Sequence, residues 1–258
     1  MEWRAAWNGT PAMDLAEEEA LLSDVAANAR PFLLAYGWDR PVLVLGYGQE
    51  PSEVNLAVCR ERGVSVLRRC SGGAGVLHQG DLALSLVLPG DHPWAGSIAG
   101  LYEEFVAALQ GGLHTLGVKT TRSQAHGHGG RPRSAICFED HRAETLLLGG
   151  KKVLGCSQAR RRGAVLIHGA LLLGVDAELQ SEVYGVSRER IEALLGTVPR
   201  EAYTTREALA KHLAQCLAGA LGVRVRPFQC AAQPAAGLPQ ELASRLHDPK
   251  WVIIGSEK

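Results

Sequence analysis

Apolar residues recur along the chain with two different spacings. Helical spacing predicts helices at residues 11–28, 53–63 and 97–117, and mostly helical structure over 186–222. Shorter apolar runs bounded by Gly or Pro predict strands at residues 30–38, 41–48, 64–70, 82–89 and within 144–174. The neighbouring runs at 30–38 and 41–48 are consistent with one paired sheet region. Because strands dominate the middle of the chain and helices flank them, the pattern favours an α+β fold over a doubly wound parallel sheet.

The end of the chain has a different composition. After residue 230 the segment "AAQPAAGLPQELASRLHDPKWVIIG" begins with Pro, Gly and Ala, which predicts a linker, and continues into a short helix and an apolar anchor around Trp251. We therefore predict one large domain over residues 1–222 and a C-terminal tail over residues 223–258, whose linker and short helix pack on the core.

Composition excludes several classes of protein. Hydrophobic residues make up 46% of the 258 and charged residues 21%, which is ordinary for a globular protein. Lys and Arg total 27, as do Asp and Glu, so no nucleic-acid partner is indicated. No apolar run is long enough to span a bilayer and no signal peptide is visible, so we expect a cytoplasmic protein without a membrane partner. The six cysteines lack C-x-x-C spacing, so we predict neither a metal site nor a disulfide framework.

Residues 68–89, "RRCSGGAGVLHQGDLALSLVLP", combine two arginines, a glycine loop and an apolar strand. Glycines let the backbone approach a ligand closely and present N–H groups to an anionic or carbonyl oxygen. A tight turn between strands would explain the same glycines, and His78 alone is more typical of a structural residue. In the strand, Leu82, Leu84, Leu86 and Leu88 share one face, which predicts core; lining an apolar tunnel would be an addition to that.

Residues 137–158, "CFEDHRAETLLLGGKKVLGCSQ", form a second stretch with candidate chemistry. The Gly-Gly pair before Lys151 and Lys152 is typical of a two-residue hairpin turn. A cysteine before a strand is usually inert, and a lysine after such a turn is usually solvated. Neither Cys137 nor Lys152 would be assigned a role from this stretch alone.

Together with "VLIHGALLL", the two stretches resemble the biotin and lipoate protein ligase family, and most closely its cysteine-dependent octanoyltransferases. The resemblance implies a mixed, largely antiparallel sheet flanked by helices, with residues 1–222 as the catalytic domain. It also implies Cys137 as the nucleophile and Lys152, rather than Lys151, as the second catalytic residue. The residues implied in substrate binding are Arg69, Ser71, Gly72, Gly73, Ala74, Gly75, His78 and Gly155.

The resemblance further implies the reaction and its partners. Cys137 would take an octanoyl or lipoyl group from a thioester and pass it to the lysine of a lipoyl domain, and no cofactor would be needed. The donor would be an octanoyl-acyl carrier protein or an octanoylated protein of the glycine-cleavage H type. Residues 141–145 depart from the family pattern, which leaves the donor open.

Two other functions remain open at this stage. An ATP-dependent lipoate–protein ligase would use the glycine loop to hold an acyl-adenylate and would need ATP and Mg. A non-catalytic module that binds an acyl group or a lipoyl domain would keep the fold and lack the activity. His126, His128 and His141 lie in a glycine-rich segment without supporting carboxylates or cysteines, so we predict a plain loop or lid there rather than a metal site.

Overall fold

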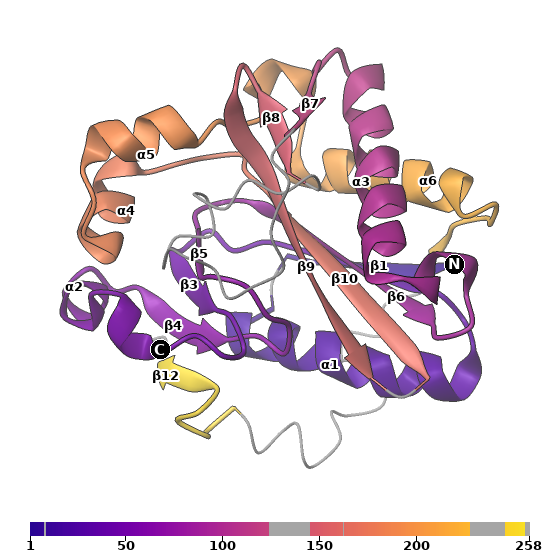
Figure 1. Cartoon of the computed structure of the whole chain (residues 1–258), viewed down its shortest axis with the longest axis horizontal. Coiled ribbons are helices and arrows are strands. Elements are labelled where there is room, and N and C mark those ends of the chain that lie inside the picture. Colours follow the sequence, from indigo (N-terminus) through magenta and orange to yellow (C-terminus); the bar gives the residue numbers. More distant parts are fainter. Residues whose placement is uncertain (8, 124–144, 162, 228–245, 256–258) are drawn as a thin grey trace.

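An eight-stranded mixed sheet forms the centre of the fold in the computed structural model (Figure 1). The structure describes residues 1–7, 9–123, 145–161, 163–227 and 246–255. In spatial order the strands are β11 (Arg226–Pro227), β1 (Glu2–Ala6), β2 (Phe32–Tyr36), β6 (Leu82–Pro89), β10 (Ala164–Leu171), β9 (Lys151–Arg161), β8 (Leu146–Leu148) and β7 (Thr121–Arg122). Strand β1 runs parallel to β2 and β11, and the other pairs are antiparallel.

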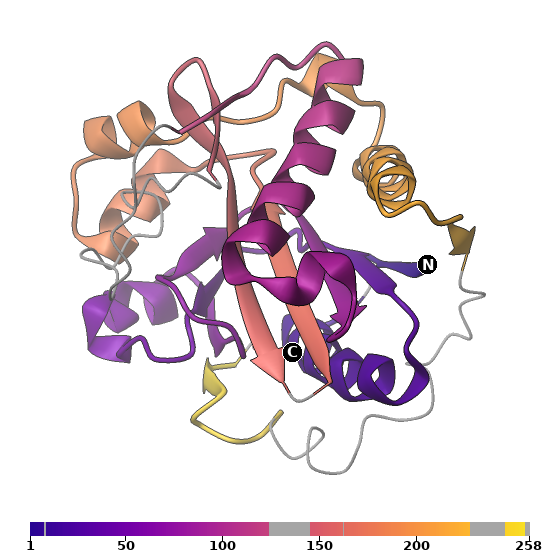
Figure 2. The same ribbon diagram turned by 45° about the vertical axis from the view of Figure 1, so that its right-hand side comes forward.

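Helices cover both faces of this sheet. Helix α1 (Pro11–Asn28) packs on β2, β6 and β10. Helices α3 (Ile98–Thr115) and α6 (Arg206–Ala220) pack against each other on the opposite face, where Figure 2 shows α3 in front of β9 and β10. Because both faces are covered, all eight residues of β6 are buried. Its leucines lie in the core on the α3 and α6 side, while Ala83 and Val87 lie in the core beside α1.

A second sheet of four strands lies beside the first. Its order is β12 (Val252–Ile254), β4 (Ser65–Arg68), β3 (Val42–Leu45) and β5 (Val76–His78), in which β3 and β4 are parallel. Helices α2 (Leu56–Glu61), α4 (Ala177–Tyr184) and α5 (Arg188–Leu194) share a separate apolar core with it. Three short 3₁₀ turns, η1 (Pro51–Glu53), η2 (Pro93–Gly96) and η3 (Arg200–Ala202), join these elements.

The α+β prediction, with a mixed and largely antiparallel sheet, is confirmed. The first helix begins after Thr10, whose hydroxyl caps it by accepting from the backbone N–H of Met13. The hairpin turn at Gly149 and Gly150 has φ values of 58° and 82°, which is the left-handed backbone that glycine allows.

One predicted pairing is wrong. The runs that become β2 and β3 do not pair with each other, because β2 lies between β1 and β6 in the large sheet and β3 lies in the small one. Adjacent apolar runs pair only if the turn between them directs the second strand back onto the first, and the connection here carries the chain into the other sheet.

The two described ends of the tail lie on the body of the protein. Strand β11 pairs with β1, and β12 pairs with β4. The predicted linker and short helix fall almost entirely outside the described residues, so the boundary between residues 222 and 223 stays a prediction. None of the helices in the described ranges has both the length and the apolar character needed to cross a membrane.

Candidate active site

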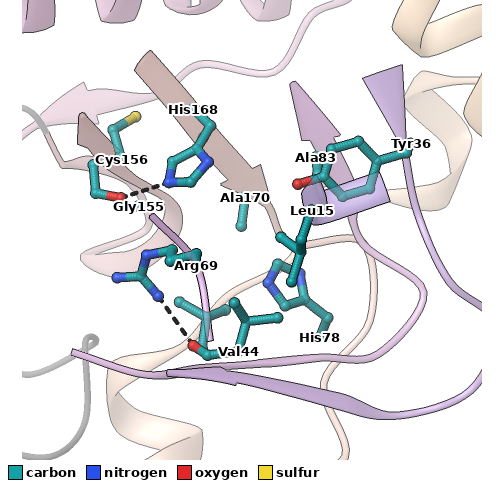
Figure 3. Close-up of a pocket in the computed structure, with 13 residues that line it drawn as sticks. Leu15, Tyr36, Val44, Arg69, His78, Ala83, Gly155, Cys156, His168 and Ala170 are labelled. Atoms are coloured by element: carbon teal, nitrogen blue, oxygen red, sulfur yellow. Dashed lines mark hydrogen bonds between the residues drawn. The ribbon is translucent and has the colours of Figure 1, made fainter. Parts of the chain in front are cut away.

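A pocket lies where the two sheets approach each other, and about 430 Å³ of empty space, which includes the open solvent at its mouth, lies in it (Figure 3). It is lined from α1 and from strands of both sheets, by Leu15, Tyr36, Val44, Arg69, Val76, His78, Ala83, Gly155, Cys156, Ser157, His168, Gly169 and Ala170. Most of these side chains are apolar, and the polar groups are few. Such a site holds an apolar ligand and orients it through a small number of hydrogen bonds.

The glycine loop, residues 71–75, adjoins this pocket and contacts the end of β3. Gly73 has a φ of 93°, which a side chain would strain. A Cβ atom on Gly46 would come within 1.8 Å of the carbonyl oxygen of Gly73, so the strand end and the loop touch through backbone. This close approach is to the end of a strand, and the approach of the loop to a ligand stays a prediction.

Arg69 holds that loop in place. Its guanidinium donates to the carbonyl oxygens of Val44, Gly72 and Ala74 at 2.7–3.0 Å, and its Nε donates to the hydroxyl of Ser71 at 3.0 Å. The side chain is only 6% exposed, although it lines the pocket. Its cation therefore organises the carbonyls and the hydroxyl that surround the pocket.

A chain of buried polar groups crosses the wall of the pocket. His168 of β10 contacts the carboxylate of Glu18 of α1 through Nδ1 at 3.1 Å. Its Nε2 lies 2.6 Å from the hydroxyl of Ser71 and 2.7 Å from that of Ser157, a contact drawn in Figure 3. Elements far apart in sequence thus place a carboxylate, an imidazole and two hydroxyls in direct contact.

The carboxylate of Glu18 is fully buried, and side-chain donors surround it. Burial alone would raise the pKa of Glu18, but the neighbouring His168 and the hydroxyls of Ser85 and Tyr36 outweigh it and lower the pKa. Conversely, burial and the charge of Glu18 raise the pKa of Tyr36 well above its usual value. Glu18 is therefore an anion and Tyr36 a neutral donor.

A second histidine reaches the pocket from β5. Nδ1 of His78 lies 3.4 Å from Oδ2 of Asp81, and its ring packs edge-on against Trp38 at 5.1 Å between centroids. Burial raises the pKa of Asp81 despite the nearby histidine. His78 thus lines the pocket, where packing as well as the acid holds it, and the role in substrate binding that the resemblance implies stays a prediction.

The two adjacent lysines differ sharply. Lys151 is exposed, whereas Lys152 is buried, with 2% exposed. The backbone of Lys152 forms an isolated parallel bridge with Leu195. Lys152 lies three residues before Gly155 on β9 and is not itself one of the residues that line the described part of the pocket. Of the pair, only Lys152 brings an ammonium group into the interior.

The predicted site residues fall into three sets. Arg69, His78 and Gly155 line the pocket. Ser71 reaches it by hydrogen bonds, and Gly72, Gly73, Ala74 and Gly75 complete the adjoining loop. Cys137, like His126, His128 and His141, lies outside the described residues.

The wall of the pocket differs from the one predicted. Within the described residues, strand β6 contributes Ala83, whereas its four leucines lie in the core with α3 and α6. The predicted leucine wall is therefore wrong, because the pocket opens on the α1 side of the sheet. The sequence could not show this, since an apolar strand covered on both faces gives no sign of which side is hollow.

Sequence reasoning missed Glu18, His168 and Ser157. Glu18 sits in the acidic run Glu17–Glu19, which is typical of a solvated helix face, and His168 sits inside an apolar strand. The one available signal was a titratable residue within a strand that is otherwise fully apolar. Their contacts join residues up to 150 positions apart, which no local pattern reveals.

The described cysteines differ in their environments. Burial raises the pKa of Cys59 to about 11 and that of Cys70 to about 12, so both are protonated at neutral pH. Cys156 lines the pocket, with its sulfur directed away from the ring of His168 (Figure 3). Within the described ranges, no three His, Cys, Asp or Glu side chains gather as a metal site would require.

A two-sheet α+β fold with this pocket defines the class of the protein, which is that of the lipoate ligase fold. The chain superimposes with a TM-score of 0.73 on a bipartite lipoate protein ligase from Thermoplasma acidophilum, at 23% identity over 95% of this chain and 90% of the other. The family model for the lipoyl protein ligase A/B catalytic domain matches residues 10–213, and the chain belongs to that family.

Curated relatives of known name extend the comparison. The octanoyltransferase LipM of Kyrpidia tusciae is 31% identical over 260 residues, covering 94% of each chain. The octanoyltransferase LipM of Geobacillus kaustophilus is 32% identical over 205 residues, covering 75% of this chain and 73% of the relative.

Proposed function

We propose that this protein is an octanoyltransferase that carries the acyl group as a thioester on Cys137 and delivers it to the lysine of a lipoyl domain. The observation that carries the proposal is the apolar pocket between the two sheets, in a chain whose family and named relatives handle lipoyl and octanoyl groups. In the first step the thiolate of Cys137 attacks the donor thioester and expels the donor thiolate. In the second the lysine amine attacks, an amide forms, and the Cys137 thiolate is released.

The walls of the pocket suit a saturated acyl chain. Leu15, Val44, Val76, Ala83 and Ala170 offer apolar surface from four elements and from α1. Burial of each methylene contributes about 0.8 kcal/mol, or roughly 5 kcal/mol for octanoate. That is enough to hold the chain in register while the carbonyl reacts.

Lys152 is the residue we assign to the activation of the thiol. A free cysteine with a pKa of about 8.5 is only a few per cent thiolate at neutral pH. A buried ammonium such as that of Lys152 favours the thiolate and the negatively charged oxygen of the tetrahedral intermediate. We assign the backbone N–H groups of the glycine loop to the same oxygen.

The partners follow from this chemistry. A thioester donor is already activated, so transfer needs neither ATP nor Mg. The donor would be an octanoyl-acyl carrier protein or an octanoylated H-type protein of glycine cleavage, and the acceptor a lipoyl domain. The carrier protein presents a thioester, whose attack by Cys137 releases a thiolate. The H-type protein presents an amide, whose attack breaks the carbon–nitrogen bond and releases the donor's lysine amine, which takes up a proton. A direct comparison of the two donors assigns the physiological one.

The test is intact-mass spectrometry after incubation with octanoyl-acyl carrier protein. The wild-type protein and Cys156→Ser should each gain one octanoyl group, and Cys137→Ser should gain none. Cys156→Ser is the matched control because Cys156 is the described thiol that lines the pocket. An adduct that survives Cys137→Ser and disappears in Cys156→Ser would show that Cys156 is the nucleophile and would overturn that part of the proposal.

The same preparation distinguishes the two alternatives. A lipoate–protein ligase would form no adduct and would modify a lipoyl domain only with lipoate, ATP and Mg. A binding module would give neither product. We expect transfer from the carrier protein to the lipoyl domain in the absence of ATP.

A further inference from the structure

The contact with Glu18 fixes which nitrogen carries the hydrogen when the ring of His168 is neutral. The Glu18 carboxylate can only accept, so Nδ1 of His168 must carry a hydrogen and donate it. Nε2 of the neutral ring is then an acceptor. It faces the pocket wall, where the hydroxyls of Ser71 and Ser157 lie within 2.7 Å.

The two hydroxyls complete an ordered path to the pocket. They lie 2.7 Å from each other, and Ser71 already accepts from Nε of Arg69. A neutral ring has one lone pair at Nε2, for which the two hydroxyls compete. When Ser157 donates to it, Arg69 donates to Ser71 and Ser71 to Ser157, and the 2.6 Å contact between Ser71 and Nε2 carries no hydrogen. Ser71 is 1% exposed, whereas Ser157 lines the pocket, so the path opens through Ser157. Hydrogen bonds aligned in one direction polarise one another.

We infer that His168 is the base that takes the proton of the attacking lysine amine, through the hydroxyl of Ser157, with Glu18 as the residue that positions it. The inference rests on the proposed acyl transfer. As the nitrogen–carbon bond forms and the carbon–sulfur bond breaks, the amine proton passes to Ser157 and the Ser157 proton to Nε2. The electron pair of the broken bond leaves on sulfur as a thiolate. The imidazolium then returns its proton to water.

The surroundings of the ring support a base at this place. Glu18 stabilises the imidazolium that forms and holds the ring in the required tautomer, as the acid does in carboxylate–histidine–serine triads. The other titratable or charged groups that face the ring or its carboxylate are Asp14, Tyr36, Arg69, Cys70 and His78. Moving a carboxylate out of water costs free energy. Titratable groups that are buried beside a specific partner in a pocket concentrate at functional sites.

The two half-reactions can be measured separately. Protein loaded with octanoate is isolated, its loading is quantified by intact mass, and single-turnover transfer to a lipoyl domain is followed. His168→Gln should load normally and transfer about 10²–10⁴-fold more slowly. Glu18→Gln should also slow transfer, because its amide can donate to Nδ1, which moves the ring hydrogen to Nε2 and removes the acceptor.

The hydroxyls give an internal check. Nε2 contacts both Ser71 and Ser157, so Ser157→Ala should slow transfer less than His168→Gln does. The double variant of Ser71→Ala with Ser157→Ala should lose more than the two single losses combined. Val183→Ala, which opens a hole in the separate core of the small sheet, is the control for reduced stability and should transfer at close to the wild-type rate.

The pH profile separates a base from a structural residue. In the wild type transfer should require two deprotonations, of the ring and of the attacking amine, so the logarithm of the rate should rise with a slope near two at low pH. In His168→Gln only the amine, with a free pKa of about 10.4, should remain, and the slope should fall to one. Wild-type rates and an unchanged profile in both His168→Gln and Glu18→Gln would overturn the relay alone. Absence of an adduct on the wild-type protein would overturn the proposed function and the relay with it.

Discussion

At the scale of single residues, Asp14 makes the stability of this protein depend on pH. Its carboxylate accepts from the indole of Trp38 at 2.8 Å inside α1's buried face. Burial raises the pKa of Asp14 from 3.8 to about 7, although the bond from Trp38 opposes the rise. The folded state therefore keeps a proton that the unfolded chain releases. This contribution to stability is complete below about pH 4 and is lost as the pH rises to about 7.

Asp14→Asn removes that dependence. The amide oxygen keeps an acceptor for Trp38, and the residue no longer ionises. The unfolding free energy of the variant minus that of the wild type should increase from about pH 4 to pH 8, by no more than about 4 kcal/mol. Urea unfolding at both pH values measures the gain, and the difference between proteins cancels the other titrating groups. An equal difference at the two pH values would mean that Asp14 is ionised in the folded state throughout.

At the scale of elements, the contact between the end of β3 and the glycine loop decides whether the pocket keeps its shape. A Cβ atom on Gly46 would meet the carbonyl oxygen of Gly73 at 1.8 Å, and backbone cannot rotate away as a side chain does. Gly46→Ala should therefore cost about 1–3 kcal/mol and displace the loop that Arg69 and Ser71 share.

The neighbouring glycine supplies the control for that variant. A Cβ on Gly48 meets nothing within 4 Å, so Gly48→Ala should change stability by less than about 0.5 kcal/mol. We expect thermal unfolding and acyl transfer to separate the two alanine variants clearly. If they behaved alike, the loop would not depend on close backbone contact.

At the scale of the whole molecule, the C-terminal strand ties two cores together. Val252 packs on the core beside α1, while Ile253 and Ile254 pack on that of the small sheet. Nε of Arg68 donates to the carbonyl of Lys250, and the same side chain donates to the carbonyls of Gly46 and Gln49. The last described strand thus adds to the apolar contacts that already join the two sheets.

Deletion of residues 246–258 tests this role. It removes the pairing with β4 and uncovers Val66 and Leu67, which are at most 3% exposed. The expected cost is about 2 kcal/mol, which lowers the thermal midpoint by roughly 4–8 °C for a chain of this size. A shorter deletion of residues 256–258 is the control. Equal midpoints for the two truncated proteins would show that β12 contributes nothing to stability.

Much of the fold could be predicted from local patterns, since α1, α3, β6 and the hairpin at Gly149 each follow from spacing or turn chemistry. Their assembly could not, because the pairing of β2 with β6 depends on contacts across 50 positions. The site divides in the same way. The glycine loop and Lys152 are visible in short motifs, whereas Glu18 and His168 acquire meaning only when α1 is laid across β10.

The turn at Gly149 and Gly150 has a consequence for the chemistry inside the protein. Leu148 and Lys151 close a two-residue loop, the shortest that a hairpin uses. Loss of one glycine would draw Lys151 into the turn and move Lys152 to the exposed closing position, because a shift of one residue exchanges the faces of a strand. The length of a surface turn therefore decides whether the ammonium-bearing side chain of Lys152 lies in the interior or at the exposed closing position.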